Sequence, residues 1–353
     1  MKNDFKQAIE LLKQLIAIPS LSKQEDKTAE LIFQYLSSKG YKPERKGNNV
    51  WVKSILSESL PLILLNSHHD TVKPSSSWTI DPFTPAETDG KLFGLGSNDA
   101  GASLVSLMFA FFHLANDKNR PYNLIFSATG EEEISGKGGI ESILPDLGKI
   151  DLAIVGEPTQ MQMAVAERGL MVLDCKTKGK TGHAARNEGI NAIYLAIDDI
   201  KWFRSFKFPN ESPLLGPVKM SVTLINAGSQ HNVVPDECTY IVDVRTNEFY
   251  KNQEAYEIVR QHVKHSEVTP RSLNLNSSCI ALNHPLVKRG LDLGLKYFGS
   301  PTSSDQKKIP YPSIKIGPGD SARSHTADEF IYIEEIKQGI DVYIKLLENL
   351  FLK

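Results

Sequence analysis

Apolar residues recur at helical spacing over the first part of the chain. Between residues 5 and 16 they fall three or four positions apart, with charged and amide side chains on the opposite face, which predicts an amphipathic helix ending near Pro19. The apolar positions are Phe5, Ala8, Ile9, Leu12, Leu15 and Ile16. Ser22 and Glu25 have the spacing of a capping box, so we expect a second helix that Gly40 closes. Neither helix carries a pattern of catalytic residues.

Short apolar runs typical of strands then alternate with helical patterns. The strands are expected at residues 50–52, 62–66, 123–129 and 151–155, and the helices at about 102–114 and 138–144. Strands that alternate with helices favour a sheet whose two faces are both covered. The pattern therefore predicts an α/β fold with a mixed, mostly parallel sheet and helices on both faces.

The order of elements changes between residues 170 and 275. It becomes strand, helix, strand, strand, helix, strand, with expected bounds of 171–177, 190–203, 219–226, 238–245, 253–263 and 272–275. This β-α-β-β-α-β order is that of a ferredoxin-like α+β unit. We therefore expect residues 169–275 to form an inserted second domain. Residues 1–168 and 276–353 would form the first, which resumes with a helix at 285–298, a strand at 313–316 and a long helix at 333–350.

Two imidazoles and a carboxylate follow the apolar strand at 62–66. His68 and Asp70 are two positions apart, so they project to the same side if the strand geometry continues, whereas His69 points the other way. Open α/β sheets carry their chemistry at the carboxyl edge of the strands. A single histidine there is more often a hydrogen-bonded structural residue, and we interpret His69 in that way. The metal hypothesis for His68 depends on partners elsewhere in the chain.

Four later stretches place acids or a histidine at expected junctions between elements. They contain Asp99, the triplet Glu131–Glu133, Glu157 within Gly-Glu-Pro, and His325. Each alone has an ordinary interpretation, such as a helix N-cap, a solvated acidic helix start or a turn. Together, two histidines and several carboxylates would supply ligands for two divalent ions that share one carboxylate.

These motifs, in this order, resemble the M20 family of metallopeptidases and N-acyl-amino-acid deacylases, in particular its acetylornithine deacetylase and succinyl-diaminopimelate desuccinylase branch. The resemblance implies a zinc-peptidase-like catalytic domain with two Zn²⁺ ions, which Co²⁺ can replace. The implied ligands are His68, Asp99, Glu133, Glu157 and His325, with Asp99 bridging both ions. Glu132 would be the general base, and Asp70 would orient His68 by a hydrogen bond. Because the family pattern has a pair of glutamates, the triplet leaves the register open by one residue, and we align the last two.

The same resemblance gives the inserted domain a supporting role as a lid and dimerisation domain. His183 and Asn232 match family residues that approach the substrate, with the histidine reaching over from the partner subunit of a dimer to stabilise the oxyanion. Arg245 matches an arginine that pairs with a substrate carboxylate. The alternative for each residue is a structural role, either in a loop where its polar groups are hydrogen-bonded or in a surface ion pair.

Composition excludes several other classes of protein. A chain of 353 residues is long enough for two domains, and its net charge of -2 gives no basic surface for nucleic acid. The three cysteines, Cys175, Cys238 and Cys279, are scattered and disfavour a disulfide framework or a zinc finger. No stretch approaches the about 18 apolar residues of a membrane span, and the N-terminal residues lack the apolar core of a signal peptide. We therefore expect a cytoplasmic protein without a membrane partner.

The substrate is the least determined feature. The stretch from Ser303 to Gln306 departs from the Thr-Ser-Asp-Gly-Arg pattern of the desuccinylases and lacks their arginine, so the resemblance favours removal of an acetyl-type group from an amino acid, as by acetylornithine deacetylase of arginine biosynthesis. N-acetylcitrulline, N-acetyllysine and N-succinyl amino acids stay open as substrates, and a family aminopeptidase or dipeptidase is the nearest rival. A serine hydrolase built on Ser321 is weakly supported, because the Gly-Asp-Ser-Ala-Arg sequence lacks the final glycine of a nucleophile elbow. The presence of Glu132 argues against a degenerate binding protein.

Overall fold

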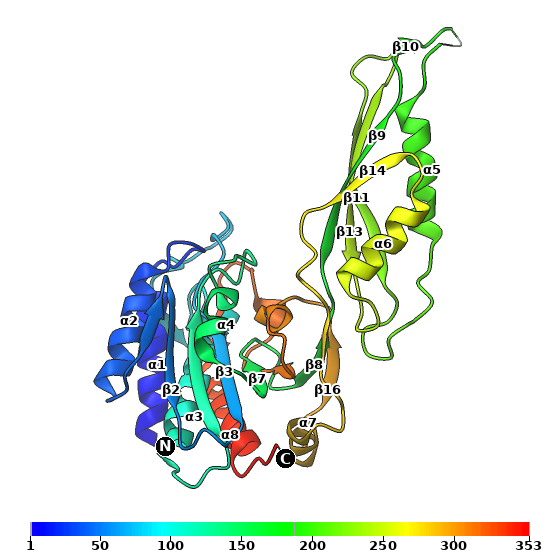
Figure 1. Ribbon diagram of the computed structural model, residues 1–353. Helices are drawn as coiled ribbons and strands as arrows, with labels where there is room; N and C mark the ends of the chain where they lie inside the picture. Colours follow the sequence, from blue (N-terminus) through cyan, green and yellow to red (C-terminus); the bar gives the residue numbers. More distant parts are fainter. Residues whose placement is uncertain (1, 187, 353) are drawn as a thin grey trace. The chain divides into compact units, whose positions relative to one another are not determined.

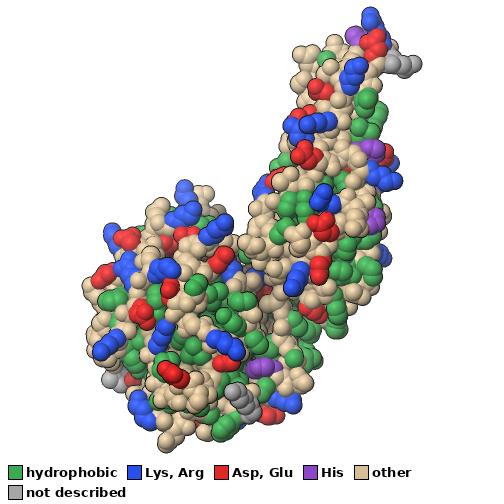
Figure 2. Space-filling view, in the orientation of Figure 1, with side chains coloured by type: hydrophobic (Ala, Val, Ile, Leu, Met, Phe, Trp, Pro, Cys, Tyr) green, Lys and Arg blue, Asp and Glu red, His purple; other side chains and the backbone are tan. Residues whose placement is uncertain are grey.

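The chain folds into two compact units. Figure 1 shows the computed structural model, which describes residues 2–186 and 188–352. The first unit consists of Met1–Val165, Cys279–Phe298 and Ser304–Lys353, and the second of Ala166–Ser278 and Gly299–Ser303. The second unit thus starts and ends within a few residues of the expected insertion, and it also takes in Gly299–Ser303. On the face seen in Figure 2, basic and acidic side chains are mixed over both units.

A nine-stranded mixed sheet forms the centre of the first unit. The strand order is β1-β2-β6-β3-β7-β17-β8-β15, and β16 also pairs with β8. The strands β6, β3, β7 and β17 are parallel to one another. Antiparallel pairing joins β2 to β6, β8 to β17, and β1 to β2. Their bounds are β1 Glu44–Lys46, β2 Asn49–Ser54, β3 Leu62–His68, β6 Asn123–Thr129, β7 Leu152–Val155, β8 Met163–Glu167, β15 Ser278–Cys279, β16 Tyr297–Ser300 and β17 Ser313–Lys315. The predicted α/β class with a mixed sheet is confirmed, and the parallel pairs lie at its centre.

Helices cover both faces of this sheet, which explains why its central strands are continuous apolar runs. On one face α3 packs against β3 and β6 and also contacts α1 and α8. On the other face α4 packs onto Leu64, Ile125 and Ala153 of the central strands (Figure 1). The helices of this unit are α1 Lys2–Ile16, α2 Asp26–Ser38, α3 Ala102–Asn116, α4 Ile140–Leu147, α7 Pro285–Asp292 and α8 Ile333–Leu347.

Two local predictions in the first unit are wrong. Ser22 and Glu25 form no capping box, because the Ser22 hydroxyl donates to Asp70 Oδ2 (2.7 Å) and the Glu25 side chain makes no cap hydrogen bond at α2. The helix expected at 285–298 ends at Asp292, since Gly294 has a left-handed φ of 82° and the N–H of the next residue returns to the Gly290 carbonyl. Residues Tyr297–Ser300 form β16 instead.

A small second sheet in this unit links the chain around residue 90 to the chain around residue 330. It has the order β18-β5-β4, with β4 Ala86–Thr88, β5 Lys91–Phe93 and β18 Phe330–Tyr332. The pairing of β18 with β5 is antiparallel and sets Phe330 opposite Phe93. Sequence patterning did not predict these three-residue strands. They hold two loops of the candidate site beside each other.

The second unit is ferredoxin-like, as predicted. Its antiparallel sheet has the order β11-β13-β9-β14, and its elements are β9 Met171–Lys178, α5 Ala192–Ser205, β11 Lys219–Ala227, β13 Glu237–Arg245, α6 Asn252–His262 and β14 Ser266–Pro270. Buried and part-exposed residues alternate along β9 and β13, so one face of the sheet is buried with residues of the two helices. Two-residue strands, β10 Gly182–His183 and β12 Val233–Val234, pair at one end of the unit.

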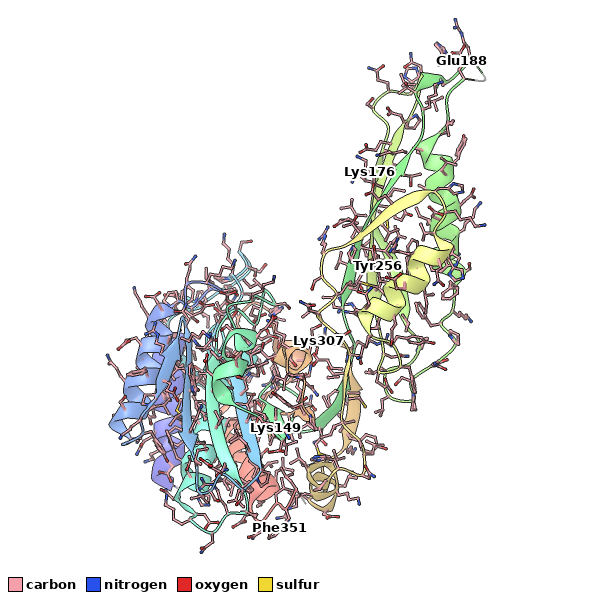
Figure 3. The ribbon with its side chains drawn as sticks, in the orientation of Figure 1. Lys149, Lys176, Glu188, Tyr256, Lys307 and Phe351 are labelled. Carbon is pink, nitrogen blue, oxygen red and sulfur yellow. The ribbon has the colours of Figure 1, made fainter. Side chains whose placement is uncertain are left out.

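The last strand of this unit lies earlier than expected. The prediction at 272–275 was wrong, because β14 pairs with β9 at Ser266–Pro270 and the Tyr256 hydroxyl of α6 donates to the Val268 carbonyl (2.9 Å) (Figure 3). Leu273 packs against the core of the unit without joining the sheet. Within the described residues, no helix has both the length and the apolar character to span a membrane.

Candidate metal centre

The candidate ligands meet at the carboxyl ends of the parallel strands. His68 is the last residue of β3, and the register of β3 with β6 pairs it with Thr129, just before the Glu131–Glu133 triplet. Glu157 follows the end of β7 by two residues. Because parallel strands end at the same edge of a sheet, these side chains converge although they are far apart in the sequence.

Asp99 stands between the two histidines. The His68 Nε2 atom lies 3.3 Å from Asp99 Oδ1, and the His325 Nε2 atom lies 3.7 Å from Asp99 Oδ2. Each histidine also has its own glutamate: His68 Nε2 is 3.8 Å from Glu157 Oε1, and His325 Nε2 is 2.9 Å from Glu133 Oε2. The two oxygens of one carboxylate therefore face two different imidazoles.

These side chains form two overlapping groups with the spacing of metal ligands. The ligand atoms of His68, Asp99 and Glu133 lie within 4.8 Å of one another, as do those of His68, Glu132 and Glu157. Imidazole nitrogens and carboxylate oxygens are the donors that Zn²⁺ and Co²⁺ accept. The residues present therefore fit a pair of divalent cations.

The electrostatics of the cluster favour positive charge. Burial raises the pKa of both Glu132 and Glu157 well above the usual range, although the nearby His68 lowers it. Burial by itself lowers the pKa of His68, but its contacts with Asp70 and Asp99 outweigh this and raise it. The hydrogen bond to Glu133 raises the pKa of His325 to about 9. The buried carboxyl groups of the cluster therefore tend to keep their protons. Bound divalent cations would neutralise the same negative charge in place of these protons.

Asp70 binds the backbone of the Glu132–Glu133 pair and also contacts His68. Its Oδ1 accepts a hydrogen bond from the Glu132 N–H (3.0 Å) and its Oδ2 one from the Glu133 N–H (3.1 Å). His68 Nδ1 lies 3.0 Å from the Asp70 main-chain carbonyl and 3.4 Å from its carboxylate. Burial raises the pKa of Asp70, but the His68 contact and the other hydrogen bonds bring it down to about 2. The expected contact with His68 therefore runs mainly through the backbone.

Glu131, the first residue of the triplet, points away from the cluster. Its φ of 55° is left-handed, and its Oε2 accepts a hydrogen bond from the Gly138 N–H (3.2 Å). A Cβ on Gly136 or Gly138 would collide with the Glu131 side chain, so both glycines are needed for this packing. Glu132 and Glu133 are consequently the two members of the triplet that face the histidines.

Three buried carboxylates near the cluster were missed from the sequence. Glu25 accepts the Glu131 N–H (3.1 Å), and Glu329 accepts the Asp99 N–H (2.9 Å). Asp305 accepts the Asn66 side-chain amide (3.0 Å) and the Thr129 hydroxyl (2.9 Å). Only Asp305 had a visible signal, because Asn66 is a polar residue inside the apolar run of β3 and requires a buried partner.

His69 is a structural residue in this fold, as we interpreted it. It is buried, its Nε2–H donates to the Asn48 carbonyl (2.8 Å), and its Nδ1 lies 2.9 Å from the Thr28 hydroxyl. Burial lowers its pKa, so the imidazole is neutral at neutral pH. Both ring nitrogens are occupied on the side of the strand opposite His68.

The other three candidate residues lie in the second unit. His183 in β10 is exposed, and the Ala184 N–H next to it donates to the Asn232 carbonyl (3.0 Å). His183 and Asn232 are thus neighbours at one end of the unit. Arg245 ends β13, and its guanidinium binds both carboxylate oxygens of Asp243 (2.8 and 3.0 Å).

Comparison with known proteins gives one consistent result. Residues 64–349 match the family model described as peptidase family M20/M25/M40. The chain is 26% identical to acetylornithine deacetylase of Proteus mirabilis (strain HI4320), over 97% of this chain and 96% of that protein. It is also 26% identical to succinyl-diaminopimelate desuccinylase of Orientia tsutsugamushi (strain Ikeda), over 92% of this chain and 85% of that protein.

Solved structures share the fold at lower sequence identity. Aminopeptidase PepT from Bacillus cereus has a TM-score of 0.79 and 18% identity, covering 98% of each chain. A protein from Bacillus subtilis described as a dinuclear metal-binding peptidase of the M20 family has a TM-score of 0.72 and 19% identity, covering 99% of this chain and 100% of that one. At these identities the likeness concerns the fold alone.

Proposed function

Because this chain belongs to the peptidase family M20/M25/M40 and is a metal-dependent hydrolase acting on amides, we propose that it removes an acetyl-type N-acyl group from an amino acid, most like acetylornithine deacetylase. The observation that carries the proposal is the Asp99 carboxylate, which faces His68 with one oxygen and His325 with the other. A carboxylate that faces two imidazoles is placed to be shared by two divalent ions, which is how we propose that this site holds them.

The proposed ligand sets follow the distances in the cluster. His68 and Glu157 would hold one Zn²⁺ ion, His325 and Glu133 the other, and Asp99 would bridge them. Co²⁺ would substitute because it accepts the same donors. When bound, such ions polarise an amide carbonyl and lower the pKa of a water molecule.

Glu132 is proposed as the general base that takes a proton from the attacking water and passes it to the leaving nitrogen. Its carboxylate has atoms within 4.8 Å of the ligand atoms of His68 and Glu157, so it borders the cluster. Burial raises its pKa, which favours the protonated form that Glu132 adopts after it has taken the proton from water. Asp70 supports this role by holding the Glu132 N–H.

The substrate proposal depends on the stretch that contains Asp305. Two residues after this buried aspartate, where the desuccinylase pattern has arginine, the chain has Lys307. A lysine ammonium cannot form the planar bidentate contact with a carboxylate that an arginine provides. A neutral acetyl group, which has no second carboxylate to anchor, fits this chain better than a succinyl group.

A panel of substrates tests the proposal. The purified protein, supplied with Zn²⁺ or Co²⁺, should release free amine fastest from an N-acetylated amino acid, with N-acetylornithine first and N-acetylcitrulline, N-acetyllysine and an N-succinyl amino acid behind it. The Glu132→Gln protein, prepared in parallel, controls for contaminating hydrolases. Faster cleavage of unblocked dipeptides or tripeptides would contradict the deacylase assignment and indicate an aminopeptidase.

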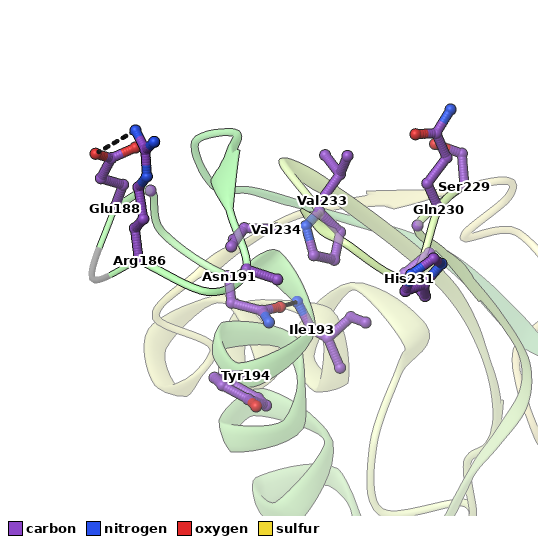
Figure 4. A pocket seen from close by; sticks show the side chains of 15 residues that line it. Arg186, Glu188, Asn191, Ile193, Tyr194, Ser229, Gln230, His231, Val233 and Val234 are labelled. Atoms are coloured by element: carbon purple, nitrogen blue, oxygen red, sulfur yellow. Dashed lines mark hydrogen bonds and ion pairs between the residues drawn. The ribbon is translucent and has the colours of Figure 1, made fainter.

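We also propose that the second unit forms a homodimer. Strand β11 is one of the two edge strands of its sheet, and it exposes Leu224 (47%) and Ile225 (49%), while Tyr194 on α5 is 69% exposed. An exposed apolar edge strand favours pairing with another chain. Beside it lies a surface hollow of about 930 Å³, lined at one end by Arg186 and at the other by His231 (Figure 4).

The dimer proposal includes action of His183 in the partner's site. His183→Ala should lower kcat far more than it alters metal content, because an oxyanion contact acts only in the transition state. Mixing this variant with Glu132→Gln protein should restore part of the activity, since one hybrid site then has both residues intact. His265→Ala, which changes another exposed histidine of the same unit, is the control. A monomer by sedimentation, or no rescue after verified subunit exchange, would reject action in trans.

A further inference from the structure

Glu329 is a buried carboxylate to which the proposed mechanism gives no role. Its side chain is 2% exposed, and it lies between the loop that carries His325 and strand β18. Burial, and next the charge of Asp99, raise the pKa of Glu329 to about 8. A carboxyl group is excluded from water at such a position only when the fold supplies hydrogen bonds in return. The partners of Glu329 therefore indicate what it does.

Both oxygens of Glu329 accept hydrogen bonds from the backbone of a single turn. Oε1 accepts from the N–H of Asn98 (2.8 Å) and of Asp99 (2.9 Å), and Oε2 accepts from the N–H of Gly96 (3.2 Å). Because backbone donors occupy both oxygens, Glu329 is not placed to be a further metal ligand. Its direct contact is instead with the residue whose carboxylate faces both histidines.

A second set of contacts fixes the Glu329 backbone. Its carbonyl accepts the Gly94 N–H (3.0 Å), and the next residue, Phe330, is in register with Phe93 across β18 and β5. The backbone of Glu329 and its side chain therefore both bind the turn that carries Asp99. Two separate attachments hold the turn in one position.

The Asn98 side chain ties the same turn to the loop before His325. Its Nδ2 donates to the Asp320 carbonyl (3.1 Å) and lies 3.3 Å from the Ser324 hydroxyl, while its Oδ1 accepts the Asp320 N–H (3.0 Å). Together, Glu329 and Asn98 join the turn that carries Asp99 to the loop that carries His325.

We propose that Glu329 is a positioning residue that fixes the Asp99 carboxylate between His68 and His325, and so determines the affinity of the site for both metal ions. The proposal rests on the proposed two-metal function. Only two torsion angles separate the Asp99 carboxylate from the backbone that Glu329 holds, so a displacement of the N–H moves the carboxylate with it. Metal ligands depend on such supporting contacts for their orientation.

Glu329→Gln tests this inference with little change in volume. The new amide group must turn N–H donors toward at least one of the backbone N–H groups, which breaks part of the clamp. Asp328→Asn is the matched control, because Asp328 is the adjacent acid and also binds backbone, through the Thr79 N–H (2.9 Å), but not the Asp99 turn. Both full-length variants are titrated with Zn²⁺ against a chromophoric chelator and with Co²⁺ by visible absorption.

We expect Glu329→Gln to keep the far-ultraviolet circular dichroism of the parent and to lose affinity for both ions by about 10–100-fold, the usual effect of removing a supporting partner. Its Co²⁺ spectrum should change, and kcat should fall with little change in KM at saturating metal. Asp328→Asn should behave as the parent does. A folded Glu329→Gln protein with parental metal affinity and Co²⁺ spectrum would overturn the proposal.

Other outcomes are also decisive. If the parent and Asp328→Asn bind no metal, the two-metal function fails, which is a different result from parental binding by Glu329→Gln. If Glu329→Gln does not fold, Glu329→Asp keeps the charge and withdraws the acceptors by one methylene, and it should lose the same affinity. Parental binding by Glu329→Asp, or failure of both variants to fold, would leave Glu329 a purely structural residue and reject its role in positioning.

Discussion

Replacing Glu132 by glutamine should leave metal binding intact and lower kcat by at least about 10²-fold, the lower end of what a general base contributes. The amide has nearly the same shape as the carboxylate but cannot accept a proton from the attacking water. Because the Asp70 carboxylate binds the Glu132 backbone and not its side chain, the loop should keep its position in the variant. The loss should therefore appear in kcat, with metal content unchanged.

Glu133→Gln is the matched comparison, since it makes the same change one residue later. The Glu133 carboxylate lies 2.9 Å from His325 Nε2, so this variant should bind metal more weakly. Its kcat at saturating metal should fall less than that of Glu132→Gln. Metal content by elemental analysis and kcat at saturating Zn²⁺ distinguish the two effects. An exchange of the two phenotypes would mean that Glu133 is the base and Glu132 the ligand.

Removing the metal with a chelator should abolish turnover of the best substrate, and adding back Zn²⁺ or Co²⁺ should restore it. The cluster brings His68, His325 and Asp99 together with three glutamates, and in the proposed mechanism the bound cations supply the polarisation of the amide carbonyl. Removal of the Lewis acid should therefore leave no measurable activity.

Two controls accompany this experiment. The chelated protein should keep its circular dichroism, which excludes unfolding as the cause of inactivity. Ser321→Ala should keep full activity with metal present, because Ser321 lies in a short exposed turn and has no place in the two-metal scheme. Turnover that resists chelation and disappears in Ser321→Ala would replace the metal mechanism by a serine mechanism.

Local patterns in the sequence predicted the central sheet, and they also predicted that the polar residues at the ends of its strands lie close together. The run of β3 ends at His68, and β6 and β7 end just before the glutamates, so one rule about parallel strands gathers three of the motifs. The ferredoxin-like order could also be predicted, because each of its elements except the last has a recognisable helix or strand periodicity. Its final strand was misplaced since Ser266–Pro270 has only one large apolar residue.

The supporting contacts could not be predicted in this way. Glu25 and Glu329 bind backbone N–H groups, and a backbone donor has no signature in the amino-acid sequence. Their partners lie about a hundred or more positions away, where only the completed fold sets the distance. The same limit explains Asp70, whose carboxylate was expected to bind His68 and also holds two amides of the glutamate loop.

The place of the second unit within the first has a consequence for biosynthesis. His68, Asp99, Glu133 and Glu157 all precede the insertion, whereas His325 and Glu329 follow it. Domains fold largely in the order of their synthesis. A ribosome must therefore complete the whole ferredoxin-like unit before it adds His325, and a nascent chain halted earlier holds only His68 of the two proposed imidazole ligands.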